Sequence, residues 1–138
     1  MLAATIRFHV QNSTGVALAA TDTISVTGKF TQITTATGVM AVNAQITPIP
    51  STSGNSLASG GFYSGSAIDT TTTGTTLFLE GHFLGSASIS TATPAGNINI
   101  FIQESPDGGT TWPANGVGTL VGVIAFSAVG TITAPVEC

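Results

Sequence analysis

Charged side chains are scarce in this sequence. Of its 138 residues, two are lysine or arginine and six are aspartate or glutamate, so the net charge is −4. Charged residues make up 6% of the chain, against about 25% in an average soluble protein. The two cations, Arg7 and Lys29, cannot form the clustered basic surface that binds nucleic-acid phosphates. We therefore expect neither nucleic acid nor an anionic membrane surface as a partner.

Cysteine is nearly absent as well, because Cys138, the last residue, is the only one. A single cysteine cannot form an intrachain disulfide, so the framework that stabilises small exported domains is excluded. Residues 1–10 do not show the basic segment followed by an apolar run that marks a secretory leader. We expect the chain to be made in the cytoplasm and kept whole.

Long hydrophobic runs are also missing. The longest apolar stretch, 117–126, is interrupted by Gly118, Thr119 and Gly122, and it is shorter than the roughly 20 residues of a spanning helix. Yet 42% of the residues are hydrophobic and the mean hydropathy is +0.45. A chain that is this apolar and this poor in charge indicates a surface covered by partners.

The clearest local pattern lies in residues 97–126. Ile98, Ile100 and Ile102 alternate with polar residues, which predicts a strand over 97–104 with one buried face. Asp107-Gly108-Gly109 supplies a turn, since glycine accepts positive φ and an aspartate side chain bonds the following backbone. Residues 110–112 suit a return to extended structure. We predict that 97–104 pairs antiparallel with a strand within 119–127.

Alternating apolar residues and turn signals recur along the whole chain, and no segment has helical spacing. The pattern predicts an all-β fold, an antiparallel β-sandwich or jelly roll of about eight short strands. We expect one domain over 1–138, with a Ser/Gly/Thr-rich loop region at 51–76. One long strand is expected at 39–47, ended by Pro48 and Pro50. Another is expected at 77–84, with Leu77, Leu79 and Phe83 on the face opposite Phe78, Glu80, His82 and Leu84.

Residues 105–112 read SPDGGTTW and match the pattern S-x-D-x-G-x-T-W. The matching positions are Ser105, Asp107, Gly109, Thr111 and Trp112. The segment thereby resembles the Asp box of sialidase propellers, where the box braces a hairpin away from the catalytic centre. The resemblance implies a structural turn and no activity. A propeller needs at least four blades of about 40 residues, and this chain has only Arg7 where sialidases use several arginines.

The same turn between alternating strands, in a chain rich in Gly, Thr, Ser and Ala, resembles small phage virion proteins. The motif covers 97–126, and the rest of the chain resembles them by composition. The resemblance implies a non-enzymatic protein of the virion, which binds its own copies and the capsid shell as a decoration (cement) protein. The alternative is a tail component or a tail-tip carbohydrate-binding or adhesin module that uses Trp112 and Tyr63.

Chemically reactive residues do not form a recognisable catalytic or metal-binding pattern. His9 and His82 have no cysteine or carboxylate at a ligand spacing, so we predict ordinary strand residues, no metal and no cofactor. No serine stands in a motif with either histidine. The carboxylates that a glycosidase pair would need are Asp22, Asp69, Glu80, Glu104 and Asp107, of which Asp107 is explained by the turn and Glu104 by its strand edge. We predict that the chain is not an enzyme.

Two segments are predicted to contact partners. Phe62 and Tyr63 interrupt the loop region at 51–76, and a long loop in a compact domain is often functional. The run 120–126 is apolar on both faces, with Val121 and Val123 opposite Ile124. A single sandwich core covers one face of a strand, so the second face predicts another subunit or a scaffold, either the major capsid protein or a tail protein. We expect a homo-oligomer, with a trimer preferred.

Overall fold

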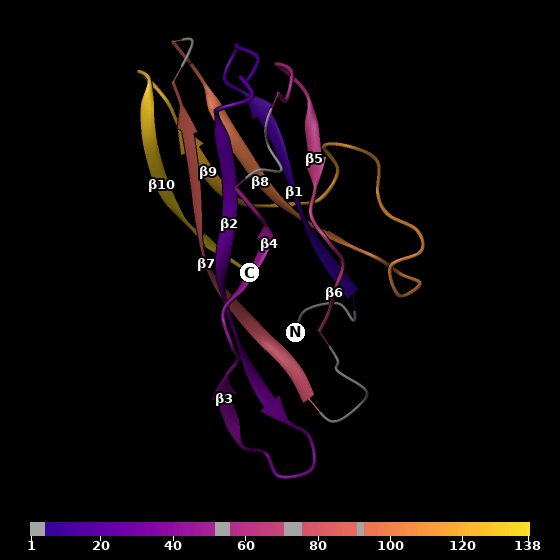
Figure 1. Cartoon of the computed structure of the whole chain (residues 1–138). Helices are drawn as coiled ribbons and strands as arrows, with labels where there is room; N and C mark the ends of the chain where they lie inside the picture. Colours follow the sequence, from indigo (N-terminus) through magenta and orange to yellow (C-terminus); the bar gives the residue numbers. More distant parts are fainter. Residues whose placement is uncertain (1–4, 52–55, 71–75, 91–92) are drawn as a thin grey trace.

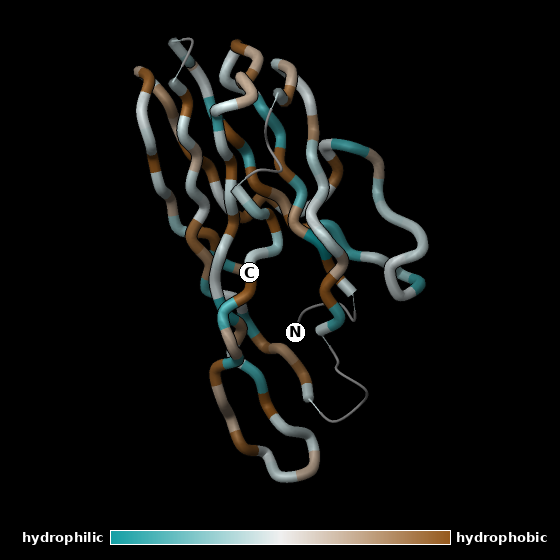
Figure 2. Tube along the Cα trace, viewed as in Figure 1, coloured by the Kyte–Doolittle hydropathy of each residue, from teal (hydrophilic) through white to brown (hydrophobic). Residues whose placement is uncertain are grey.

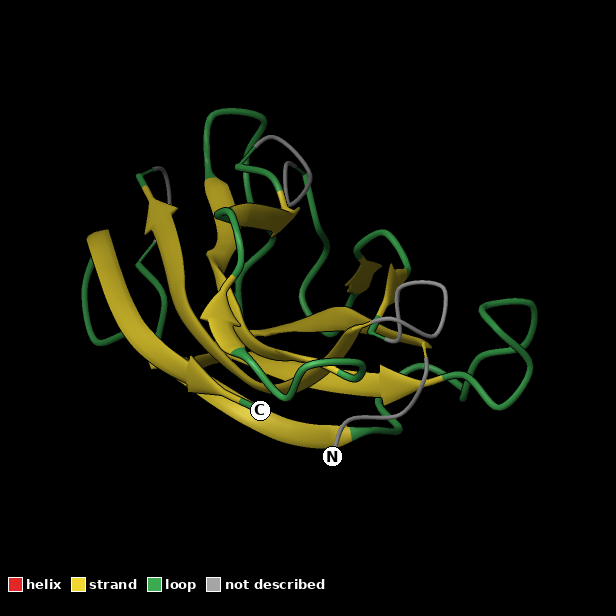
Figure 3. Cartoon of the chain, turned by 90° about the horizontal axis from the view of Figure 1, so that it is seen from below, coloured by secondary structure: helices red, strands yellow, loops and turns green. Residues whose placement is uncertain are grey.

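The computed structural model describes residues 5–51, 56–70, 76–90 and 93–138. These residues form strands and loops, without a helix among them (Figure 3). The strands are β1 (Thr5–Ser13), β2 (Thr23–Thr34), β3 (Met40–Val42), β4 (Ile46–Ile49), β5 (Phe62–Ser64), β6 (Ile68–Asp69), β7 (Thr76–Ile89), β8 (Asn97–Glu104), β9 (Thr119–Ala125) and β10 (Gly130–Glu137). They confirm the all-β prediction, with ten strands in the described residues instead of eight.

Two antiparallel sheets pack face to face as a β-sandwich (Figure 1). The first sheet has the order β5-β1-β8-β9, and β6 also pairs with β1. The second has the order β10-β7-β2-β3, and β4 also pairs with β2. The predicted pairing of 97–104 with 119–127 is confirmed, because Asn97 lies opposite Ala125 and Ile102 opposite Thr119.

The core lies between the two sheets and is built from the alternating apolar positions. On β1 and β8 these are the buried residues Ile6, Phe8, Val10, Ile98, Ile100 and Ile102. The second sheet contributes three phenylalanines in contact, because the ring of Phe30 lies 4.8 Å from that of Phe78 and 5.0 Å from that of Phe83. We call the side of each sheet turned away from this core its outer face.

Two β-bulges place residues on the opposite face of the strand from the one that strict alternation predicts. The register between β2 and β7 shifts between Thr31 and Gln32, which moves Phe78 to the buried side, where Phe83 also lies. The expected opposition of these two residues is therefore wrong. A second shift, between Ile100 and Phe101, leaves Val121 unpaired between Leu120 and Gly122. An extra residue in one strand reverses the facing of everything beyond it.

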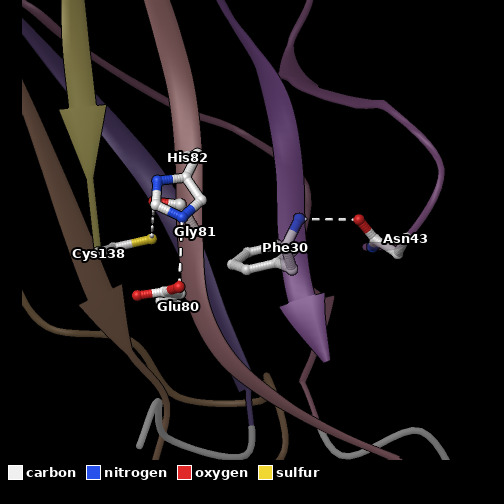
Figure 4. A network of polar contacts seen from close by, with 6 residues as sticks. All are labelled: Phe30, Asn43, Glu80, Gly81, His82 and Cys138. Atoms are coloured by element: carbon white, nitrogen blue, oxygen red, sulfur yellow. Dashed lines mark hydrogen bonds and ion pairs between the residues drawn. The ribbon is translucent and has the colours of Figure 1, made fainter. Parts of the chain in front are cut away.

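The strand predicted at 39–47 is divided in two. β3 ends at Val42 and β4 begins at Ile46, and Asn43 holds the chain between them. The Asn43 side-chain oxygen accepts a hydrogen bond of 2.8 Å from the backbone N–H of Phe30 (Figure 4), and the backbone N–H of Asn43 donates to the Phe30 carbonyl. Pro48 lies inside β4 and does not end it.

The end of β2 and the short β3 form a hairpin that projects beyond the sandwich (Figure 1). We call residues 31–42 the β2–β3 hairpin. Its apolar side chains are not covered: Val39 is 58% exposed, Met40 61% and Val42 64%. Hydrophobic segments are visible along it in Figure 2.

Candidate functional site

The connection between β8 and β9, residues 105–118, lies over the outer face of the first sheet. We call it the 105–118 loop. Its first turn is held by the Ser105 hydroxyl, which donates to Asp107 Oδ1 over 2.8 Å and accepts from the Gly109 N–H over 2.7 Å. The Asp107 carboxylate accepts from the Thr110 and Thr111 N–H groups, at 3.1 and 2.7 Å, and from the Thr111 hydroxyl.

These bonds stabilise the charged form of the exposed Asp107 side chain. The hydroxyl of Thr111 contributes most, followed by the Thr111 N–H and the Ser105 hydroxyl, and together they lower the pKa of Asp107 to about 2. The turn predicted at Asp107-Gly108-Gly109 is therefore present, with the bonding expected of an aspartate. Residues 110–112 do not return to a strand as predicted, because they continue as a bend of the loop.

Trp112 fastens the loop to β1. Its indole N–H donates to the Gly109 carbonyl over 3.0 Å, and the Arg7 guanidinium carbon lies 4.4 Å from the ring centroid. A cation over an indole face is attracted by the ring quadrupole. The Trp112 ring is half-buried, with one face covered by Arg7.

Gln103 is the residue that ties the loop to β8, and its side chain is fully buried. Its oxygen accepts from Arg7 Nε over 2.8 Å. Its amide nitrogen lies 2.7 Å from the Val117 carbonyl oxygen and 3.1 Å from that of Ala114. Sequence reasoning assigned Gln103 only to the polar side of a strand, and nothing in the sequence shows that the loop folds back over it.

His9 lies beside this network and is also fully buried. Its Nε2 accepts from the Gly116 N–H over 3.4 Å, so the ring proton belongs on Nδ1, which donates to Ser64 Oγ over 2.8 Å. Burial, with a further contribution from the positive charge of Arg7, lowers the pKa of His9. In this tautomer Nδ1 has no lone pair for the Ser64 proton, so the pair is not arranged as nucleophile and base.

The residues predicted to contact partners do not lie on one common surface. Phe62 is stacked on His9, with ring centroids 5.3 Å apart, whereas the next residue, Tyr63, packs against the core between the sheets. Trp112 lies over the outer face, so it and Tyr63 do not share a surface. Val121 packs partly against the core, and Val123 is 40% exposed.

Three further residues with reactive side chains, Glu80, His82 and Cys138, lie at the second sheet (Figure 4). His82 Nε2 is 3.3 Å from a Glu80 carboxylate oxygen, and both side chains are exposed. Cys138 Sγ lies 4.0 Å from the Gly81 carbonyl oxygen, and burial raises the pKa of the thiol to about 11. The part of the chain that the structure describes contains no group of three His, Cys, Asp or Glu side chains that could hold a metal ion.

No family model matches this chain, and neither a curated protein nor a solved structure is significantly similar to it. Within the described residues, no helix has the length and apolar character needed to cross a bilayer. Two features of the structure therefore bear on function. One is the polar cluster that the 105–118 loop covers on the first sheet, and the other is the exposed apolar β2–β3 hairpin of the second sheet.

Proposed function

We propose that this chain is a non-enzymatic structural protein of a phage particle, which binds its own copies and the capsid shell as a decoration (cement) protein. The observation that carries the proposal is the β2–β3 hairpin, where Val39, Met40 and Val42 are each more than half exposed. Monomeric proteins rarely expose contiguous apolar patches, and such patches mark interaction sites. No charged residue occurs between Lys29 and Asp69, so nothing in this stretch repels a second copy electrostatically.

Apolar exposure on the outer faces of both sheets supports more than one contact per chain. Leu84 is 51% exposed on the outer face of the second sheet, beside a shallow groove lined by Thr27, Lys29 and Ser86. Leu120, on β9 of the first sheet, is 52% exposed. A cement protein needs one surface for its own copies and another for the shell. Closed symmetry is the usual arrangement for identical chains, and we retain a trimer as the preferred oligomer.

The polar cluster under the 105–118 loop supports a structural role more than a catalytic one. No buried side-chain nitrogen or oxygen among the described residues lacks a hydrogen-bond partner. Gln103 and His9 have their polar atoms bonded to the loop and to neighbouring strands. The alternative, a carbohydrate-binding or adhesin module in the tail, loses the joint platform of Trp112 and Tyr63, because the two side chains lie on different sides of the first sheet.

The test is to purify the phage particles and to ask whether the chain co-purifies with them and in what copy number. We expect a fixed ratio to the major capsid protein. Purified chain, added to particles stripped of it, should rebind. A double variant, Met40→Ser with Val42→Ser, should rebind poorly. Val129→Ser is the matched control, since Val129 is 52% exposed but lies in the turn between β9 and β10.

Two results would contradict the proposal. One is a chain that is absent from shells and tails. The other is a chain that sediments as a monomer at micromolar concentration and does not bind stripped particles. Co-purification with tails instead of shells would favour the tail component.

A further inference from the structure

The buried imidazole of His9 connects three elements of the first sheet. It belongs to β1, donates from Nδ1 to Ser64 of β5, and accepts at Nε2 from the Gly116 N–H of the 105–118 loop. Its ring is stacked on Phe62 at an interplanar angle of 12°. Of these contacts, the one with Gly116 requires the neutral ring, because Nε2 can accept a hydrogen bond only without a second proton.

A second proton on His9 changes two interactions at once. Nε2 becomes a donor that faces the Gly116 N–H, so a hydrogen bond is replaced by two opposed donors. The new positive charge lies on the same outer face as the Arg7 guanidinium, two residues along β1, in a site from which water is excluded. A buried charge without a partner is costly.

No carboxylate among the described residues around His9 is placed to stabilise a positive charge on its ring. On β1 the neighbouring charge is Arg7, and β5 carries no charged residue. Glu104 of β8 and Asp69 of β6 pair opposite Ile6 and Thr5, roughly 10–13 Å along β1 from His9 at the rise of a strand. On the loop, the carboxylate of Asp107 is engaged by the N–H groups and hydroxyls of its own turn.

We propose that protonation of His9 releases the 105–118 loop from the outer face of the first sheet, so that the loop is closed near neutral pH and opens in mild acid. Opening removes Gly116 from the imidazole and uncovers Phe62, whose ring lies beside Gly116 and 5.3 Å from that of His9. The apolar surface for partners is thereby larger in acid than at neutral pH. The turn formed by Ser105, Asp107 and Thr111 moves with the loop as a unit, since the carboxylate of Asp107 stays charged down to a pH of about 2.

The sign of the pH dependence follows from linkage. His9 has a lowered pKa in the closed state and an ordinary value, about 6.5, once it is exposed. The open state therefore binds the proton more readily, and the ratio of closed to open loop falls as the pH falls below about 6.5. Between the two pKa values the ratio falls about tenfold for each pH unit, and below the closed-state value it levels off.

Amide hydrogen exchange at Gly116 measures this ratio directly. We expect its protection factor, corrected for the intrinsic pH dependence of exchange, to fall about tenfold per pH unit over that interval. The amides of β8 at Ile98 and Ile100 serve as the internal reference and should keep their protection. The imidazole signals of His9 and His82, followed by NMR on the same sample, should show His9 becoming protonated at the lower end of the pH interval over which Gly116 loses protection.

Two variants isolate the cause. His9→Gln has an amide that can accept from Gly116 and donate to Ser64 but does not titrate, so its Gly116 protection factor should be independent of pH. His82→Gln is the matched control, because His82 is exposed on the other sheet, and it should behave as wild type. The sole tryptophan, Trp112, gives a second readout by fluorescence.

Three outcomes would overturn the proposal. The first is a Gly116 protection factor that stays constant from pH 7 to pH 4. The second is a fall that persists in His9→Gln. The third applies even if His9→Gln does not fold: in wild type, protection at Gly116 reaches its low-pH level while the His9 ring is still neutral.

Discussion

The 105–118 loop and the β2–β3 hairpin both extend from the ends of long strands. They differ in whether the rest of the chain covers their side chains. The loop folds back over its sheet, where its backbone bonds to Gln103 and His9 and its Trp112 ring lies against Arg7. The hairpin projects away from the sandwich and leaves Met40 and Val42 uncovered. In and under the loop, no buried side-chain nitrogen or oxygen of the described residues lacks a hydrogen-bond partner, whereas the apolar side chains of the hairpin are not buried by the chain itself.

This difference separates what stabilises the fold from what remains for a partner. Buried polar groups contribute to stability only while all their partners are in place, so changes in or under the loop should destabilise the monomer. Apolar side chains that are mostly exposed contribute little to monomer stability. Changes in the hairpin should alter association and leave unfolding almost unchanged.

Gln103→Leu should show the largest effect on stability. The substitution removes the donor to the Ala114 and Val117 carbonyls and leaves the Arg7 side chain without its acceptor. Each buried polar group that loses its partner costs about 1–3 kcal/mol, and we expect a total loss of about 3 kcal/mol. Urea denaturation measures it. A loss below about 0.5 kcal/mol would mean that the loop does not depend on Gln103.

Trp112→Ala should come next, with a loss of about 2 kcal/mol. A fully buried tryptophan costs about 3–5 kcal/mol when truncated to alanine, but the ring of Trp112 is only half-buried. Trp112→Phe is the matched control, because it keeps a ring beside Arg7 and loses only the N–H bond to Gly109. Thermal unfolding of the three proteins should rank Ala below Phe and Phe below wild type. Equal melting temperatures would show that the Trp112 ring does not stabilise the loop.

Asp107→Asn should lower the melting temperature by less than Trp112→Ala, and the difference should depend on pH. The pKa of Asp107 is lowered from 3.8 to about 2, so its contribution is fully present above about pH 4. It is lost as the pH falls toward 2, where wild type and variant should converge. Melting temperatures between pH 6 and pH 2 measure this. A difference that is the same at both ends would show that the charge is not involved.

The double change Met40→Ser with Val42→Ser should have the smallest effect on unfolding, within about 0.5 kcal/mol of wild type, as is usual for exposed positions. Its effect should appear in sedimentation velocity instead, as a shift toward smaller species at micromolar concentration. Val129→Ser, at the turn between β9 and β10, should sediment as wild type does. A large loss of stability in the double variant would show that the hairpin side chains stabilise the monomer, as those of the loop do.

Much of the loop's first turn could be predicted from the sequence, because its bonds are local. Ser105, Asp107 and Thr111 lie within seven residues, and an aspartate followed by glycines has few other ways to bond its backbone. The anchors of the same loop could not be predicted. Gln103 and His9 read as ordinary polar positions of strands, and the contact of His9 with Gly116 joins residues 107 positions apart.

The sequence by itself determined the all-β class, the pairing of 97–104 with the strand at 119–125, and the Asp107 turn, because each follows from side-chain alternation or from bonds between near neighbours. Only the tertiary structure decided which face Phe78 takes, that the strand expected at 39–47 is two strands, and that His9 is buried. Bulges and loop docking depend on the partner strand and on packing across the sheet. Those contacts come together only once the chain has folded.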